Sequence, residues 1–136
     1  MLVVDASAIA ELLLGRPAAR HVEKHLVKHD FDLHAPHLLD VEVLSALRRV
    51  VASAEAPPAR ADAAVADFAD LPIQRYPHDV LVPRVWELRD NFSAYDATYV
   101  ALAEVLVEER APLLTADARL ARAAEEHSEL TVLLVG

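Results

Sequence analysis

Three aspartates stand where a folded chain can bring their carboxylates together. Asp5 directly follows the apolar run LVV, which predicts a short strand buried on both faces. Asp117 closely follows a second apolar run, at 111–115, and Asp96 opens a strongly apolar helix. In open α/β sheets, the carboxyl ends of parallel strands and the amino ends of the following helices share one edge, where ligands bind. We therefore expect these three carboxylates to converge.

Clustered carboxylates repel one another, and each raises the pKa of its neighbours unless a cation neutralises them. Hard oxygen ligands without His or Cys favour Mg²⁺ or Mn²⁺. Such an ion polarises a phosphoryl oxygen and lowers the pKa of bound water, so the predicted chemistry is phosphodiester hydrolysis. Taken singly, each aspartate is better explained as a helix cap or, for Asp96 after Ser93, as part of a capping box. Their joint placement favours the metal site.

The composition excludes several other kinds of site. The chain has only two glycines, Gly15 and Gly136, so it has neither a P-loop nor a dinucleotide-binding fingerprint. It has no cysteine, which excludes disulfides and thiolate sites. The net charge of −9 argues against a protein that holds nucleic acid by bulk electrostatics, although it allows a local basic rim or a bridging cation.

The length of 136 residues and the hydrophobic content of 54% predict a single domain spanning residues 1–136. Asp5 and Glu11 lie within the first fifteen residues, which argues against a signal peptide. Every apolar run stops well short of the ~20 residues that a membrane span needs. We therefore expect a cytoplasmic protein with no membrane contact.

Apolar runs and helical periodicities alternate along the chain. Strands are expected at 2–4, 31–35, 73–76, 111–115 and 131–135, and helices at 6–14, 18–28, 38–53, 59–69, 83–89, from 93 onward, and at 118–125. This order predicts an α/β fold with three layers, in which a mostly parallel central sheet of about five strands is flanked by helices. Trp86 is expected to be the buried anchor of the 83–89 helix. Val100, Ala103 and Val107 share a side of their helix with Asp96, which favours a carboxylate at the top of the core-facing side.

Two further groups of residues each allow more than one interpretation. In the 38–53 helix, Glu42 lies at the edge of the apolar face and Asp40 is a competing acid, and spacing alone leaves both open. His21, His25 and His29 lie on one side of the 18–28 helix. Because they lack the HExxH order, a solvated or partner-facing surface is favoured over a zinc site.

Four segments, in this order, resemble the PIN-domain ribonucleases, and specifically the VapC-type toxins of toxin–antitoxin pairs: MLVVDASA, LLDVEVLSALRR, YDATYVALAE and PLLTADARLA. Together they span nearly the whole chain. The resemblance implies a PIN-like fold and a Mg²⁺- or Mn²⁺-dependent endoribonuclease that hydrolyses RNA as a toxin. It also implies a cognate antitoxin protein that blocks the site.

By the same resemblance, the family's acidic quartet falls on Asp5, Glu42, Asp96 and Asp117, which selects Glu42 over Asp40. Asp5, Asp96 and Asp117 are then the metal ligands, with Glu42 acting through water, and Asp117 is the most variable of the four in role. Ser7 and Thr115 fall at hydroxyl positions that support the acids. Ser45 departs from the pattern, because similar toxins often carry Asn one turn after the glutamate.

The sequence also allows other functions. A phosphoacceptor receiver domain also has aspartates at strand ends, but it needs a lysine near the last strands, and the only lysines are Lys24 and Lys28. A catalytically inert PIN-like binding module stays open, although four acids without a metal would cost stability. Apolar helix faces beyond what one sheet can cover favour a homodimer. Four arginines near the motifs fit either RNA phosphate contacts or ordinary solvated charges: Arg48, Arg49, Arg119 and Arg122.

Overall fold

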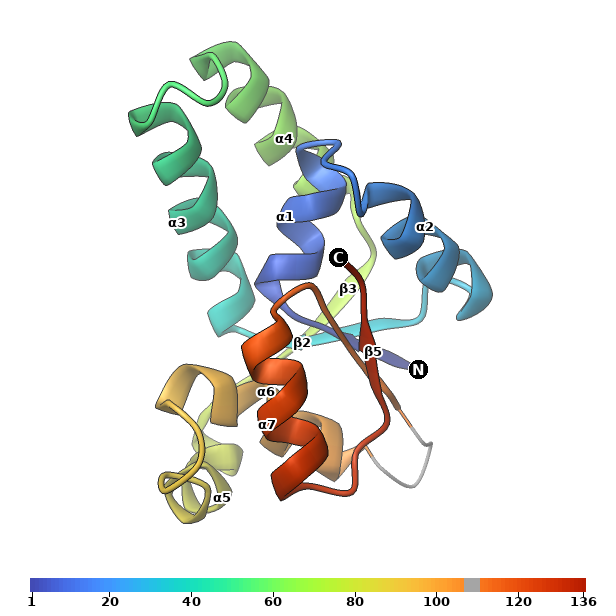
Figure 1. Cartoon of the computed structure of the whole chain (residues 1–136), viewed down its shortest axis with the longest axis vertical. Coiled ribbons are helices and arrows are strands. Elements are labelled where there is room, and N and C mark those ends of the chain that lie inside the picture. Colours follow the sequence, from blue (N-terminus) through green and yellow to red (C-terminus); the bar gives the residue numbers. More distant parts are fainter. Residues whose placement is uncertain (107–110) are drawn as a thin grey trace.

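The computed structural model describes residues 1–106 and 111–136, and within them five strands form one parallel sheet (Figure 1). The strand order is β3-β2-β1-β4-β5. The strands are β1 (Leu2–Val4), β2 (Leu33–Pro36), β3 (Ile73–Tyr76), β4 (Leu113–Thr115) and β5 (Val132–Leu134). The prediction of an α/β fold with a parallel sheet of about five strands is therefore confirmed.

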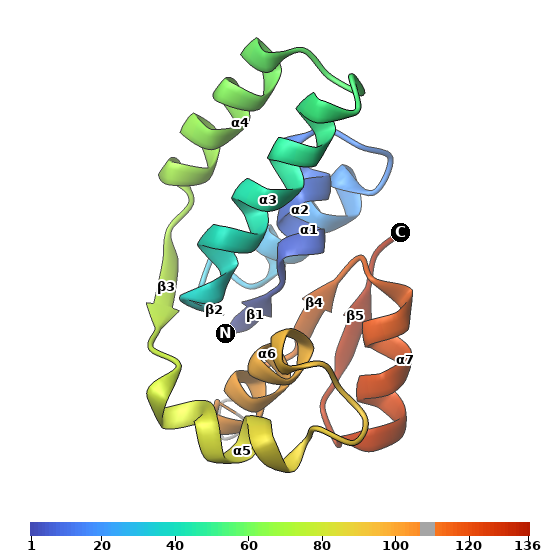
Figure 2. The same cartoon turned by 90° about the vertical axis from the view of Figure 1, so that its left-hand side faces the viewer.

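The helices lie on both faces of this sheet (Figure 2). They are α1 (Ala6–Leu13), α2 (Ala19–Lys28), α3 (Leu38–Ala52), α4 (Pro58–Asp70), α5 (Val82–Glu87), α6 (Ala94–Val105), α7 (Ala118–His127) and the 3₁₀ turn η1 (Asp79–Leu81). The connections from β1 to β2 and from β2 to β3 run toward one edge, and their helices α1 to α4 lie on one side of the sheet, where α1 and α3 contact the strands. The later connections run the opposite way, so α5 to α7 lie on the other side, where α6 and α7 contact the strands, as right-handed crossovers require.

The core is built mainly from small and branched residues. The side chains of β1 are fully buried, as are Leu113 and Leu114 of β4. On α6, which packs across β1, β2 and β4, Val100 and Ala103 are fully buried, in agreement with the predicted core-facing side. Val107, the third residue of that prediction, lies outside the described residues.

Trp86 corrects one expectation, because it is 66% exposed rather than buried. Leu81 and Leu88, which flank α5, are the residues that reach the core from this segment. A helix of six residues has fewer than two turns, so it cannot bury an apolar stripe of its own. The guanidinium of Arg89 instead stacks over the Trp86 ring, 4.5 Å from its centroid.

Among the described residues, none of the helices combines the length and the apolar character that crossing a membrane would require.

Candidate active site

The candidate site lies at the point where the strand order of the sheet reverses. The central strand β1 pairs with β2 on one side and with β4 on the other. The connection after β1 runs toward β2, and the connection after β4 runs the opposite way, toward β5. A crevice therefore opens outside the carboxyl ends of β1 and β4. Asp5 directly follows β1, and Asp117 lies two residues beyond the end of β4. The sequence therefore places both acids at this crevice.

A cavity of about 600 Å³ occupies this edge, and Asp5, Glu42, Asp96 and Asp117 all line it. Each acid comes from a different element. Asp5 and Asp117 are the N-caps of α1 and α7, Asp96 lies in the first turn of α6, and Glu42 lies in the second turn of α3. The fold thus brings the four predicted site residues to one cavity from positions up to 112 residues apart.

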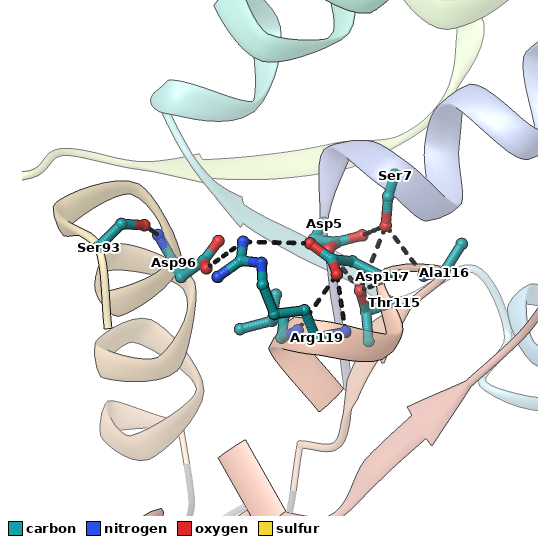
Figure 3. A network of polar contacts seen from close by, with 9 residues as sticks. Asp5, Ser7, Ser93, Asp96, Thr115, Ala116, Asp117 and Arg119 are labelled. Atoms are coloured by element: carbon teal, nitrogen blue, oxygen red, sulfur yellow. Dashed lines mark hydrogen bonds and ion pairs between the residues drawn. The ribbon is translucent and has the colours of Figure 1, made fainter. Parts of the chain in front are cut away.

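Asp5 is the most deeply buried of the four acids, with 4% of its surface exposed. Its Oδ1 accepts a hydrogen bond from Ser7 Oγ at 2.7 Å, and its Oδ2 accepts one from Thr115 Oγ1 at 2.6 Å (Figure 3). Oδ1 also accepts a hydrogen bond from the Ala8 amide at 3.0 Å. Burial raises the pKa of Asp5 to about 6, although these hydrogen bonds act in the opposite direction. The negative charge of Asp117 also contributes to this increase in pKa.

Ser7 and Thr115 connect Asp5 to the segment that follows β4. Ser7 Oγ accepts a hydrogen bond from the Ala116 amide at 2.9 Å, and Thr115 Oγ1 accepts one from the Asp117 amide at 3.0 Å. Each hydroxyl carries one proton and donates it to Asp5, so the 3.2 Å between the two hydroxyl oxygens is a close contact that adds no further donor. The two residues expected to support the acids therefore hold the ends of β1 and β4 together.

Glu42 is half-buried, and its Oε1 accepts a hydrogen bond of 2.6 Å from the Tyr99 hydroxyl on α6. Burial raises the pKa of Glu42, the bond from Tyr99 lowers it, and the charge of Asp96 raises it again. Burial and the neighbouring carboxylate together hold the pKa of Tyr99 well above its usual range, so Tyr99 keeps its proton and acts as a donor. Tyr99 was not among the residues predicted from the sequence. Its position three residues after Asp96, on the same side of the helix, is the signal that could have found it.

Asp40, the competing acid, is engaged elsewhere. Arg75 on β3 donates from Nε to Asp40 Oδ1 at 2.8 Å and to Oδ2 at 2.9 Å. Asp40 is not among the residues that line the cavity. The structure therefore gives Asp40 a role in joining α3 to β3, and gives Glu42 the place in the cavity.

Asp96 and Asp117 share one guanidinium group. Arg119 Nη2 lies 3.0 Å from Asp96 Oδ2 and 3.5 Å from Asp117 Oδ2 (Figure 3). Ser93 Oγ accepts a hydrogen bond from the Asp96 amide at 3.1 Å, which is one half of the expected capping box, while the Asp96 carboxylate contacts Arg119. Asp117 Oδ1 accepts hydrogen bonds from the amides of Arg119 and Leu120. Each acid thus contributes to a helix start while its carboxylate also lines the cavity.

The side chains that line the cavity fit a hard divalent cation. They include the carboxylates of the four predicted acids and of Glu11, and neither His nor Cys. Across residues 1–106 and 111–136, however, no three His, Cys, Asp or Glu side chains are grouped closely enough to hold a metal ion. The Arg119 guanidinium lies between two of the acids, and both oxygens of Asp5 accept hydrogen bonds from hydroxyls. The chemistry of the donors fits the ion, and their present spacing does not enclose it.

Comparisons with known proteins point to one family. The sequence profile of the PIN domain matches residues 2–126. Ribonuclease VapC1 of Mycobacterium tuberculosis is 47% identical over 122 residues, 89% of each chain. VapC ribonuclease Mb0985 of Mycobacterium bovis is 41% identical over 133 residues, 98% of each chain. The crystal structure of PAE2754 from Pyrobaculum aerophilum shares the fold, with a TM-score of 0.66, 22% identity, and coverage of 96% of this chain and 81% of that chain.

Proposed function

The chain belongs to the PIN domain family, and on that premise we propose that it is a Mg²⁺- or Mn²⁺-dependent endoribonuclease that acts as the toxin of a toxin–antitoxin pair. One observation carries the proposal: four carboxylates from four separate elements line a single cavity at the reversal point of the sheet. The relatives are named ribonucleases, which supports RNA as the substrate.

In this proposal Asp5, Asp96 and Asp117 hold the cation, with Glu42 acting through a water molecule. The bound ion would supply Lewis-acid polarisation of the phosphoryl oxygen and a water with lowered pKa. Ser7 and Thr115 fix the orientation of the Asp5 carboxylate by donating one hydrogen bond to each of its oxygens. The chain therefore holds its most buried ligand rigidly before substrate arrives.

Glu42 is suited to receive a proton from the attacking water. Tyr99 occupies Oε1, which leaves Oε2 as the oxygen that takes the proton. The pKa of Glu42 is raised toward neutral pH, and a general base is most effective when its pKa lies near the pH at which the enzyme works. Tyr99 is a positioning residue in this scheme, because it acts on the reaction through Glu42.

Recognition of RNA has to be local, because the net charge of −9 repels a polyanion at long range. Within residues 1–106 and 111–136, Arg16 and Arg49 are the arginines that line the cavity. Arg16 pairs with Glu11 and with Glu55, at 3.5 Å and 2.9 Å, so much of its charge is already neutralised. Arg49 is therefore the residue that we assign to a phosphate of the RNA.

The remaining assignments follow the VapC resemblance. They are a single domain over residues 1–136, a cytoplasmic location, a cognate antitoxin protein and a homodimer. Exposed apolar side chains support a protein-binding surface, because Val80, Val82 and Trp86 are each more than half exposed on or beside α5. Equilibrium sedimentation of the purified chain tests the dimer, and co-expression with the product of the adjacent reading frame tests the antitoxin.

A second candidate function is an inert PIN-like binding module. The observation that favours it is the guanidinium of Arg119, which already neutralises Asp96 and Asp117 without a metal ion. In that case the cavity would bind neither Mg²⁺ nor Mn²⁺.

Incubation of the protein with total RNA, in Mg²⁺ and in EDTA, separates the two functions. The endoribonuclease cleaves RNA only with the cation present, and the Asp5→Asn variant does not cleave it. The proposal fails if cleavage survives chelation or if Asp5→Asn leaves it unchanged. An absence of cleavage under all conditions favours the binding module.

A further inference from the structure

Arg119 occupies an unusual place for an arginine. It is the second residue of α7, directly after the N-cap region, where the helix macrodipole disfavours a positive charge. Its guanidinium lies 3.0 Å from a carboxylate oxygen of Asp96 on α6 and 3.5 Å from one of Asp117 (Figure 3). The position of Arg119 is therefore explained by these two acids and not by the helix that carries it.

The exposure of the three side chains shows how this contact is built. Asp96 is 15% exposed and Asp117 34%, whereas the side chain of Arg119 is 71% exposed. The two acids are fixed at helix starts, and the arginine reaches them from the solvent side. An ion pair of this exposed kind contributes little to stability, so it opens at low cost.

We propose that Arg119 is a displaceable counter-ion of the acid cavity: its guanidinium neutralises Asp96 and Asp117 until a divalent cation takes their oxygens and expels it. The inference rests on the proposed function, since it assumes that these acids bind the ion. Two cations cannot share the same carboxylate oxygens without strong repulsion, so the arginine and the metal compete.

The expelled guanidinium stays attached to the mouth of the cavity by a flexible side chain. A planar guanidinium forms paired hydrogen bonds with phosphate oxygens, so it can move from the two acids to a phosphate of the RNA. Metal binding would then free the positive guanidinium beside the substrate when the ion takes the oxygens of the two acids. Arg119 thereby couples loading of the ion to recognition of the phosphate.

The test is the affinity for Mn²⁺, measured by titration calorimetry in the absence of RNA. Arg119→Gln is compared with wild type and with Arg122→Gln, which changes the net charge equally at another exposed position of α7. The exposed ion pair of Arg119 opposes the metal in wild type and in Arg122→Gln, but is missing from Arg119→Gln. Arg119→Gln should therefore bind Mn²⁺ about fivefold more tightly than wild type, and Arg122→Gln should match wild type. Arg119→Lys, which restores the charge, should return the affinity toward the wild-type value.

An Arg119→Gln affinity equal to or weaker than that of wild type overturns the inference, as does an equal gain in Arg122→Gln, which would indicate a general charge effect. These outcomes leave the proposed function standing, provided that wild type binds Mn²⁺ and Asp5→Asn does not. If neither wild type nor Arg119→Gln binds Mn²⁺, both the metal site and the inference are wrong.

Discussion

The hydroxyl of Tyr99 donates a 2.6 Å hydrogen bond to Glu42 Oε1, and so joins α6 to α3 across 57 positions of sequence. Tyr99 is 2% exposed and Glu42 half-buried, so the bond forms where water competes poorly. One buried phenol therefore decides how the carboxylate of Glu42 is oriented in the cavity.

Tyr99→Phe tests this relationship. Removing the donor should lower the free energy of unfolding by about 1–3 kcal/mol, because the carboxylate loses its partner. The hydrogen bond lowers the pKa of Glu42, so its loss should move the acid limb of the pH–rate profile to higher pH. Tyr95→Phe serves as the stability control, because Tyr95 is 60% exposed. An unchanged acid limb in Tyr99→Phe would contradict the role given to Tyr99.

Asp40 and Glu42 are two residues apart on α3 and should respond very differently to amide substitution. Glu42→Gln removes the proposed base and should lower the cleavage rate by about 10²- to 10⁴-fold. Asp40→Asn weakens the contact with Arg75, outside the cavity, so the cleavage rate should stay within about twofold while the melting temperature falls slightly. Equal losses of activity in the two variants would show that Glu42 has no special place.

The raised pKa of Asp5 predicts how stability depends on pH. Its folded-state pKa of about 6 lies above the ordinary value of 3.8, so the folded chain holds the proton more tightly than the unfolded chain does. The resulting stability is present below the ordinary pKa and is lost as pH rises through about 6, by roughly 2–3 kcal/mol in total. In EDTA, Asp5→Asn should therefore be more stable than wild type at pH 7.5, and this advantage should shrink at pH 4.5.

Chemical denaturation at the two pH values measures this difference, with Asp67→Asn as the control. Asp67 is an exposed acid of α4, and its substitution should change stability by less than about 0.5 kcal/mol at either pH. Added Mg²⁺ should raise the melting temperature of wild type and leave that of Asp5→Asn unchanged. The account of Asp5 is wrong if Asp5→Asn is less stable than wild type at pH 7.5 without metal.

Ser7 and Thr115 should behave as a coupled pair, because both donate to Asp5 and both accept from the segment after β4. Ser7→Ala and Thr115→Val should each cost about 1–3 kcal/mol of unfolding free energy. In a double-mutant cycle, their coupling energy should lie between about 0.5 and 3 kcal/mol. The exposed residue Thr131 supplies the control, as Thr131→Val should add independently to either variant. Strict additivity of Ser7→Ala and Thr115→Val would exclude a shared network.

Local patterns were sufficient to predict the sheet and the place of three acids. A buried parallel strand is a short run of branched residues, and an acid just after it must lie at the sheet edge, as Asp5 does after β1. Glu42 was different, because the spacing within α3 left Asp40 as an alternative. Only the resemblance to a family selected Glu42, and the contact of Asp40 with Arg75 supplies the physical reason.

Features that depend on tertiary packing could not be predicted in the same way. The spacing within α6 places Tyr99 on the same side as Asp96, but its contact with Glu42 depends on how α6 and α3 meet at the sheet edge. The exposure of Trp86 was mispredicted because, in so short a helix, packing of the flanking Leu81 and Leu88 decides which side is buried. From the sequence, Arg119 fitted either a contact with an RNA phosphate or an ordinary solvated charge, and its contact with Asp96 depends on how α7 and α6 meet in the fold.

The most direct test of the central claim is the rate of cleavage of a labelled single-stranded RNA, measured against Mg²⁺ concentration for wild type and Asp96→Asn. If the four carboxylates form one cation-dependent site, wild type shows no cleavage in EDTA and a rate that saturates with Mg²⁺. Asp96→Asn then cleaves at least about 100-fold more slowly at every Mg²⁺ concentration, since one ligand of the ion is lost. Cleavage by wild type in EDTA, or equal rates for the two proteins, would contradict the claim.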